Sequence, residues 1–157
     1  MAYWRLYYYA VWACKNRELL IVPELEVELY KYFFIKSREL GGDLNVVGGM
    51  EDHVHLVFSL PPKYAIADFI GMLKGSSSHW ITHVLNYSGD FDWQRGYGVL
   101  SFGEQGMMRV IAYVKNQKEH HRTDRLNTRF ETWSEDEDGA ASFWNGVEGP
   151  PRNKSRG

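Results

Sequence analysis

The chain has 157 residues, of which 44% are hydrophobic and 15% aromatic, and its formal net charge is −2. This content of large apolar side chains suits one folded domain and excludes wholesale disorder. No window approaches eighteen consecutive apolar residues, which excludes a membrane span, and the apolar stretch near the start lacks the basic region of a signal peptide. A single cysteine, Cys14, cannot form an internal disulfide, so we expect a cytoplasmic location.

Hydrophobic patterning predicts seven elements in the order β-α-β-β-α-β-α. The strands are expected at residues 3–14, 43–50, 53–60 and 91–102, and the helices at residues 23–40, 65–85 and 106–122. This order lacks the regular alternation of a doubly wound sheet. We therefore expect an α+β fold in which helices pack on one face of an antiparallel sheet, a ferredoxin-like or RRM-like sandwich.

The C-terminal part of the chain changes in composition and charge. Residues 101–130 hold six basic and three acidic residues, whereas residues 131–157 hold three basic and six acidic ones. On charge alone, a solvated helix face explains the basic segment best. An acidic run at 135–139 and a Gly/Pro-rich end predict a folded domain at residues 1–123 and a largely disordered tail at residues 124–157.

Two histidines stand out in the third predicted strand. His53 and His55 are two residues apart, so both imidazoles point to the same face, a geometry that suits two nitrogen ligands of one metal. The pair alone is weak evidence, and taken alone it is better explained by one exposed histidine and one histidine satisfied by hydrogen bonds. Asp52 either orients the imidazole of His53 or is an ordinary turn residue.

The last predicted helix carries a second group of candidates. Tyr113 and Gln117 are four residues apart and share one face of that helix. Taken alone, Tyr113 is best explained as a core aromatic residue and Gln117 as a solvated one. His120 and His121 are two further possible ligands, although a histidine pair at a helix end more often complements the helix dipole.

Five segments occur in a characteristic order along the chain: WACKNR at 12–17, GGMEDHVHLV at 48–57, LKGSSS at 73–78, FDWQRGYG at 91–98 and YVKNQKEHH at 113–121. Together they resemble the small single-tyrosine transposases of bacterial insertion sequences and the related REP-associated tyrosine transposases, which have a His-hydrophobe-His motif. The resemblance covers roughly residues 3–122. Cys14 stands where the family commonly has a threonine, and the tail fits no family pattern.

The resemblance implies roles for matching positions. Tyr113 would be the nucleophile, and His53, His55 and Gln117 would hold a divalent metal, Mg²⁺ or Mn²⁺. The implied reaction nicks and rejoins single-stranded DNA through a 5′-phosphotyrosine, with hairpin DNA as the recognised partner and a homodimer as the working form. Tyr113 would act in its own subunit or in its partner's, with Gly103 or Gly106 as a flexible joint in the second case. The candidates for DNA contact are Arg5, Lys74, Arg95, Lys115 and Lys118.

Two alternatives remain open at the level of sequence. A domesticated relative would bind or nick hairpin DNA without moving an element. A metal-dependent phosphodiester hydrolase would use His53 and His55 with activated water and no tyrosyl intermediate. Tyr113 separates these classes, because only covalent transfer requires its hydroxyl.

Overall fold

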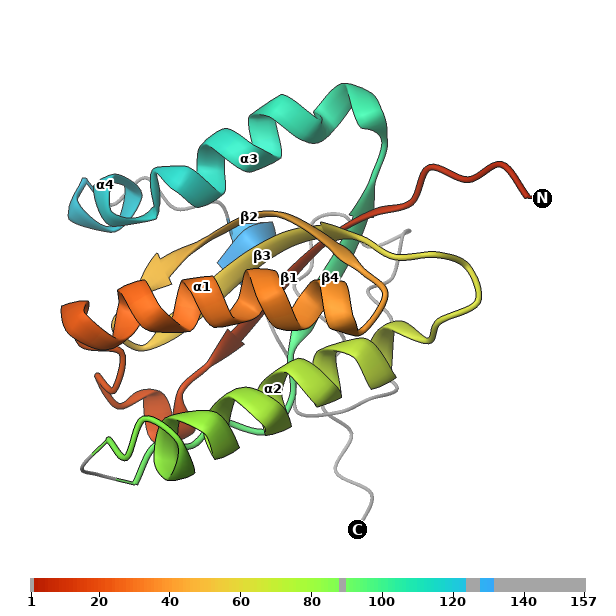
Figure 1. Ribbon diagram of the computed structural model, residues 1–157. Helices are drawn as coiled ribbons and strands as arrows, with labels where there is room; N and C mark the ends of the chain where they lie inside the picture. The colour runs from red at the N-terminus through yellow and green to blue at the C-terminus, as the bar shows by residue number, and fades with distance from the viewer. Residues whose placement is uncertain (1, 88–89, 124–127, 132–157) are drawn as a thin grey trace, which may run out of the picture.

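The computed structural model describes residues 2–87, 90–123 and 128–131 and contains one four-stranded antiparallel sheet (Figure 1). The strands are β1 (Tyr7–Ala13), β2 (Asp43–Met50), β3 (His53–Ser59) and β4 (Gly98–Phe102), in the spatial order β2-β3-β1-β4. The longer helices are α1 (Pro23–Glu39), α2 (Ile66–His83) and α3 (Met107–Lys115), and α4 (Gln117–Arg122) is short. Short 3₁₀ turns are η1 (Lys15–Arg17), η2 (Glu104–Gly106) and η3 (Thr128–Glu131). The predicted α+β fold is confirmed.

The two faces of the sheet carry different side chains because residues alternate along each strand. Ala10 and Trp12 of β1 join Leu56 and Phe58 of β3 in the main core, beneath α1 and α2. Residues at the alternate positions form a second apolar cluster with α3, namely Tyr9, Val11, Val46, Val57, Val110 and Val114. Figure 1 shows α3 and α4 on the side of the sheet opposite α1 and α2. The expectation that all helices share one face was therefore wrong: this second face is apolar too and requires a cover.

Three predicted elements differ clearly from the observed ones. The first strand, expected at 3–14, begins only at Tyr7. The strand expected at 91–102 is reduced to β4 and isolated bridges such as that between Cys14 and Trp93, because the Gly-containing segment after Trp93 forms a loop. The helix expected at 106–122 is divided at Asn116, where α3 ends and α4 begins. This break matters because Tyr113 and Gln117 lie on either side of it.

Gly48 permits α3 to lie close to the edge strand β2. A Cβ atom at Gly48 would lie 2.2 Å from the carbonyl oxygen of Val114, which is backbone and cannot rotate away. We expect Gly48→Ala to push α3 off the sheet and to lower the free energy of unfolding by about 1–3 kcal/mol.

Urea unfolding monitored by circular dichroism measures this effect. Gly71→Ala is the matched control, because Gly71 lies in α2 and an added Cβ would meet no atom within 4 Å beyond its chain neighbours and the backbone of its own helix. That control should be neutral or stabilising by up to about 1 kcal/mol. Equal stability of the two variants would show that close packing of α3 on β2 is unimportant.

Candidate metal and tyrosine site

His53 and His55 lie side by side on the face of β3 that α3 and α4 cover. Both side chains are fully buried, and their ring centroids are 4.8 Å apart. The alternation of side chains in β3 brings the two imidazoles to one face, as the sequence predicts. A buried histidine pair needs polar partners, so the neighbours of each ring nitrogen decide what the pair can do.

Each imidazole is held at its Nδ1 atom by a different residue. Nδ1 of His53 lies 2.7 Å from Oδ1 of Asp52, and the hydroxyl of Tyr9 is hydrogen-bonded to Nδ1 of His55. Arg17 donates two hydrogen bonds to Asp52, at 3.1 and 2.8 Å. Burial raises the pKa of Asp52, but the contacts with His53 and Arg17 outweigh it and hold this pKa below its usual range. An ionised Asp52 accepts the Nδ1 proton of His53, so Nε2 is the ring nitrogen that His53 presents to the cluster.

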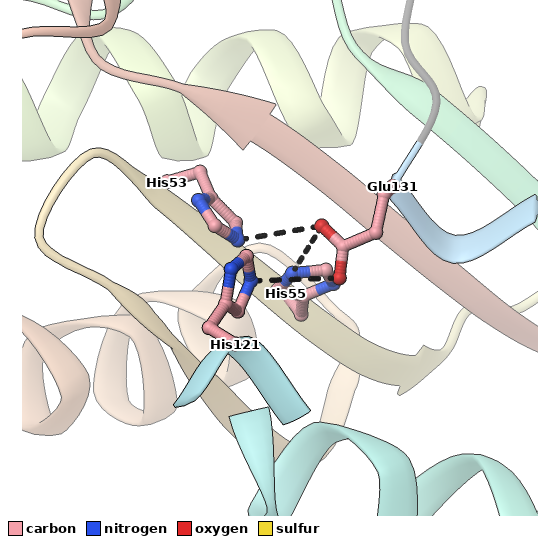
Figure 2. Close-up of side chains that lie close together, drawn as sticks. All are labelled: His53, His55, His121 and Glu131. Atoms are coloured by element: carbon pink, nitrogen blue, oxygen red, sulfur yellow. Dashed lines mark ion pairs between the residues drawn. The ribbon is translucent and has the colours of Figure 1, made fainter. Parts of the chain in front are cut away.

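His121 and Glu131 complete a group of four potential ligands with the histidine pair (Figure 2). One ligand atom from each of the four residues lies within 4.8 Å of the others. Oε2 of Glu131 is 3.5 Å from Nε2 of His53 and 3.4 Å from Nε2 of His55, and Oε1 is 3.7 Å from Nε2 of His121. Figure 2 shows that the residues come from β3, α4 and η3 and point toward one another.

Tyr113 joins this cluster from α3 of the same chain. Its side chain is 8% exposed, and its hydroxyl donates a hydrogen bond of 2.7 Å to Oε1 of Glu131. The ring stacks on His120 at 4.6 Å and contacts Phe130 at 4.9 Å, and its centroid lies 6.2 Å from that of His55. One chain therefore contains both a tyrosine hydroxyl and the histidine pair in one buried cluster.

Gln117 lies beside Tyr113 at the start of α4 and is 1% exposed. Its Nε2 atom donates to the carbonyl oxygen of Tyr113 at 3.3 Å. Its Oε1 atom is buried and has no hydrogen-bond partner among the described residues. A buried amide oxygen in this state is available as a ligand or acceptor.

The donor set fits a divalent cation. Imidazole nitrogens and carboxylate or amide oxygens are ligands for divalent metals. Burial lowers the pKa of His55 to about 4, so its imidazole is neutral near pH 7, as metal binding requires. The Nε2 atoms of His55 and His121 have no hydrogen-bond partner in the part of the chain described, although both lie near an acidic oxygen. A cation between nitrogen and carboxylate would satisfy these atoms together.

Acid is expected to destabilise the protein in the presence of a chelator. The pKa of His55 falls from 6.5 to about 4 on folding, so the unfolded chain binds more protons between these values. The free energy of unfolding should therefore decrease as the pH is lowered from about 6.5 to about 4. Urea unfolding in EDTA at several pH values measures this slope, and His55→Gln should flatten it. An unchanged slope in that variant would assign the effect to another group.

Glu131 is the functional candidate that the sequence does not reveal. It lies beyond the predicted domain boundary at residue 123 and belongs to no motif, and only the position of η3 brings it to β3. The sequence indicates His121 as a possible ligand only because it lies near Tyr113 and Gln117 in the chain. The rest of the predicted tail, residues 124–127 and 132–157, lies outside the described residues, so the predicted boundary and disorder stay predictions.

The lysine proposed for DNA contact in α2 has structural partners. Nζ of Lys74 donates to the carbonyl oxygens of Gln94 and Gly96, each at 2.8 Å. Ser77 accepts a hydrogen bond of 2.9 Å from Nε1 of Trp93. Burial lowers the pKa of Lys74 to about 8. Residues 73–78 and 91–98, two of the segments behind the family resemblance, therefore hold each other in place.

The other four basic candidates are exposed: Arg5, Arg95, Lys115 and Lys118. Arg5 pairs with Glu104, and Lys118 lies 2.8 Å from Oε2 of Glu26. Arg95 belongs to the loop that Lys74 anchors, and Lys115 is the last residue of α3, two positions after Tyr113. Their contact with DNA stays a prediction.

Comparison with known proteins assigns the family. Residues 2–117 match the family described as "Transposase IS200 like". The chain therefore belongs to the IS200-like transposases, and the resemblance found in the sequence is confirmed. No described helix is both long and apolar enough to cross a membrane.

Individual relatives agree with this assignment. The ISDra2 transposase TnpA of Deinococcus radiodurans is 27% identical over 73% of this chain and 85% of its own length. The transposase of insertion sequence element IS200 from Salmonella typhimurium is 32% identical, over 45% of this chain and 49% of its own.

Two solved structures share the fold. A putative transposase from Deinococcus radiodurans superposes with a TM-score of 0.60 at 27% identity, covering 74% of this chain and 95% of that one. A REP-associated tyrosine transposase bound to a REP hairpin gives a TM-score of 0.56 at 13% identity, covering 80% and 76%. At that identity the second likeness supports the fold alone.

Proposed function

We propose that this protein is a metal-dependent DNA transposase that nicks and rejoins single-stranded DNA through a 5′-phosphotyrosine at Tyr113. The observation that carries the proposal is the meeting of a tyrosine hydroxyl, a histidine pair and a carboxylate in one buried cluster. Family membership supports transposition as the process. Hairpin DNA is the proposed substrate, because a relative of the same fold has been solved with a REP hairpin.

The proposed metal site contains His53, His55 and Gln117, with His121 and Glu131 as further ligands. The buried positions of the histidine pair and the unsatisfied Oε1 of Gln117 support this set. A bound divalent cation, Mg²⁺ or Mn²⁺, would screen the negative charge of the scissile phosphate and help to orient it.

Tyr113 supplies the nucleophile in this proposal. Its oxygen attacks phosphorus, a bond between that oxygen and phosphorus forms, and the bond to the 3′-oxygen breaks. The phenol loses its proton and the released 3′-oxygen gains one. Glu131, which accepts the hydrogen bond of Tyr113, is in place to take the phenolic proton. A 3′-hydroxyl from another strand then attacks the phosphotyrosine, which restores a phosphodiester and frees the tyrosine.

Burial of Tyr113 against His120 and Phe130 keeps the hydroxyl at one place beside the cluster. The site is assembled within one chain, which favours action of Tyr113 in its own subunit. The homodimer and the cytoplasmic location stay predictions, and sedimentation would measure the oligomeric state.

A labelled-strand assay tests the proposed reaction. Single-stranded hairpin DNA from the flanks of the gene is incubated with the protein and Mg²⁺ or Mn²⁺. With a 3′-end label, the label should become covalently attached to the protein. With a 5′-end label, it should appear on a shorter free strand that ends in a 3′-hydroxyl. If both labelled substrates give free shorter strands and no label is attached to the protein, the protein is a hydrolase. If it binds the DNA but cleaves no flank sequence, it is a hairpin-binding relative.

A further inference from the structure

Tyr9 links the second histidine of the pair to the segment that follows α4. It lies on β1, next to β3, and is 1% exposed. Its ring centroid is 5.5 Å from that of His55 and 4.7 Å from that of Phe130. Its hydroxyl is hydrogen-bonded both to Nδ1 of His55 and to the backbone carbonyl oxygen of Phe130. Two polar partners thus share one buried hydroxyl.

The single proton of this hydroxyl determines the direction of both hydrogen bonds. A backbone carbonyl oxygen can only accept, so Tyr9 donates its proton to Phe130. A phenol is protonated at neutral pH, so the hydroxyl keeps this proton. The hydroxyl oxygen must then accept from His55, which places the imidazole proton on Nδ1. In the neutral ring the lone pair lies on Nε2, 3.4 Å from the carboxylate of Glu131.

We propose that Tyr9 is a positioning residue that fixes His55 in the tautomer with Nε2 free to bind metal, through its own hydrogen bond to the carbonyl of Phe130. The proposal rests on the metal site proposed above. Asp52 holds Nδ1 of His53 in the same way, so each histidine of the pair has its own orienting partner. Such partners fix ring orientation and ligand basicity in metal sites.

The arrangement also makes β1 and η3 part of the metal site. Neither the family motifs nor their spacing indicates Tyr9, because it lies before the first matching segment, at residues 12–17. Its role arises from the pairing of β1 with β3, which puts Tyr9 and His55 on one face, and from the position of η3.

Histidine NMR and metal binding together test this role. Long-range ¹H–¹⁵N spectra of ¹⁵N-histidine protein distinguish protonated from unprotonated ring nitrogens, and a His55→Gln variant assigns the His55 signals. In wild-type protein with EDTA we expect His55 to carry its proton on Nδ1. In Tyr9→Phe, which keeps the ring, we expect that preference to be lost and Mn²⁺ affinity, measured without DNA, to fall by about 10-fold or more.

Tyr8→Phe is the matched control. Tyr8 is the neighbour of Tyr9 on the other face of β1, where it contacts Phe58 at 5.6 Å. The same chemical change there should leave the tautomer and the Mn²⁺ affinity unchanged.

Two results would overturn the proposal. The first is a wild-type His55 with its proton on Nε2, a result that does not depend on the folding of Tyr9→Phe. The second is a Tyr9→Phe protein that matches Tyr8→Phe in both measurements. If wild-type protein binds no Mn²⁺, the proposed metal site is contradicted. The tautomer comparison still decides the role of Tyr9 in that case.

Discussion

Tyr113→Phe should abolish the covalent protein–DNA adduct and lower the rate of strand cleavage on the order of 10³-fold or more. The substitution removes the oxygen that is to bond with phosphorus and leaves the ring that packs on His120 and Phe130. The rate of adduct formation on a 3′-labelled hairpin in Mn²⁺ measures the effect. Cleavage that survives the substitution would establish water as the nucleophile and would favour the hydrolase.

The loss of activity in Tyr113→Phe has to be separated from damage to the site. The variant also loses the hydrogen bond to Glu131, so its Mn²⁺ affinity and its free energy of unfolding are measured beside its activity. We expect the metal affinity to remain within a fewfold of wild type. Tyr32→Phe is a control, because Tyr32 lies on α1 and stacks on Trp80 of α2, on the other side of the sheet.

His53→Ala should weaken Mn²⁺ binding by more than about 100-fold, since it removes one of the two fully buried imidazoles of the proposed site. Adduct formation should fall with it, and high Mn²⁺ concentrations should restore part of the activity. Calorimetric titration and the labelled-strand assay measure the two effects.

The control for His53→Ala is His79→Ala, an exposed position on α2. This variant should bind Mn²⁺ like wild type. Unchanged Mn²⁺ affinity in a folded His53→Ala protein would contradict the proposed metal site. A loss of folding would be visible in the urea transition, and His53→Gln then serves as the less disruptive replacement.

The sequence predicts the fold well because its signals are local. Alternation in β3 places His53 and His55 on one face, and the spacing of apolar residues predicts α1 to within one residue at its C-terminal end. The spacing of apolar residues does not predict the break at Asn116, because no proline or glycine marks the end of α3 there.

The site is less predictable because much of it is assembled by contacts between distant segments. Glu131 reaches the histidine pair over more than seventy positions of the chain, and Tyr9 over more than forty. Neither residue has a spacing that periodicity can detect. Lys74 shows a second limit: the sequence proposes it for DNA contact, and the structure adds that its ammonium group donates to two backbone carbonyls. Composition cannot distinguish these two uses of a positive charge.

The most direct test of the central claim is mass spectrometry of the DNA-linked peptide. After reaction with hairpin DNA and Mn²⁺, nuclease and trypsin digestion should leave a peptide of residues 110–115 that carries a residual nucleotide. Fragmentation should place the added mass on Tyr113, the only hydroxyl-bearing residue in that peptide. A nucleotide on any other residue, or cleavage of the DNA without a linked peptide, would contradict the account.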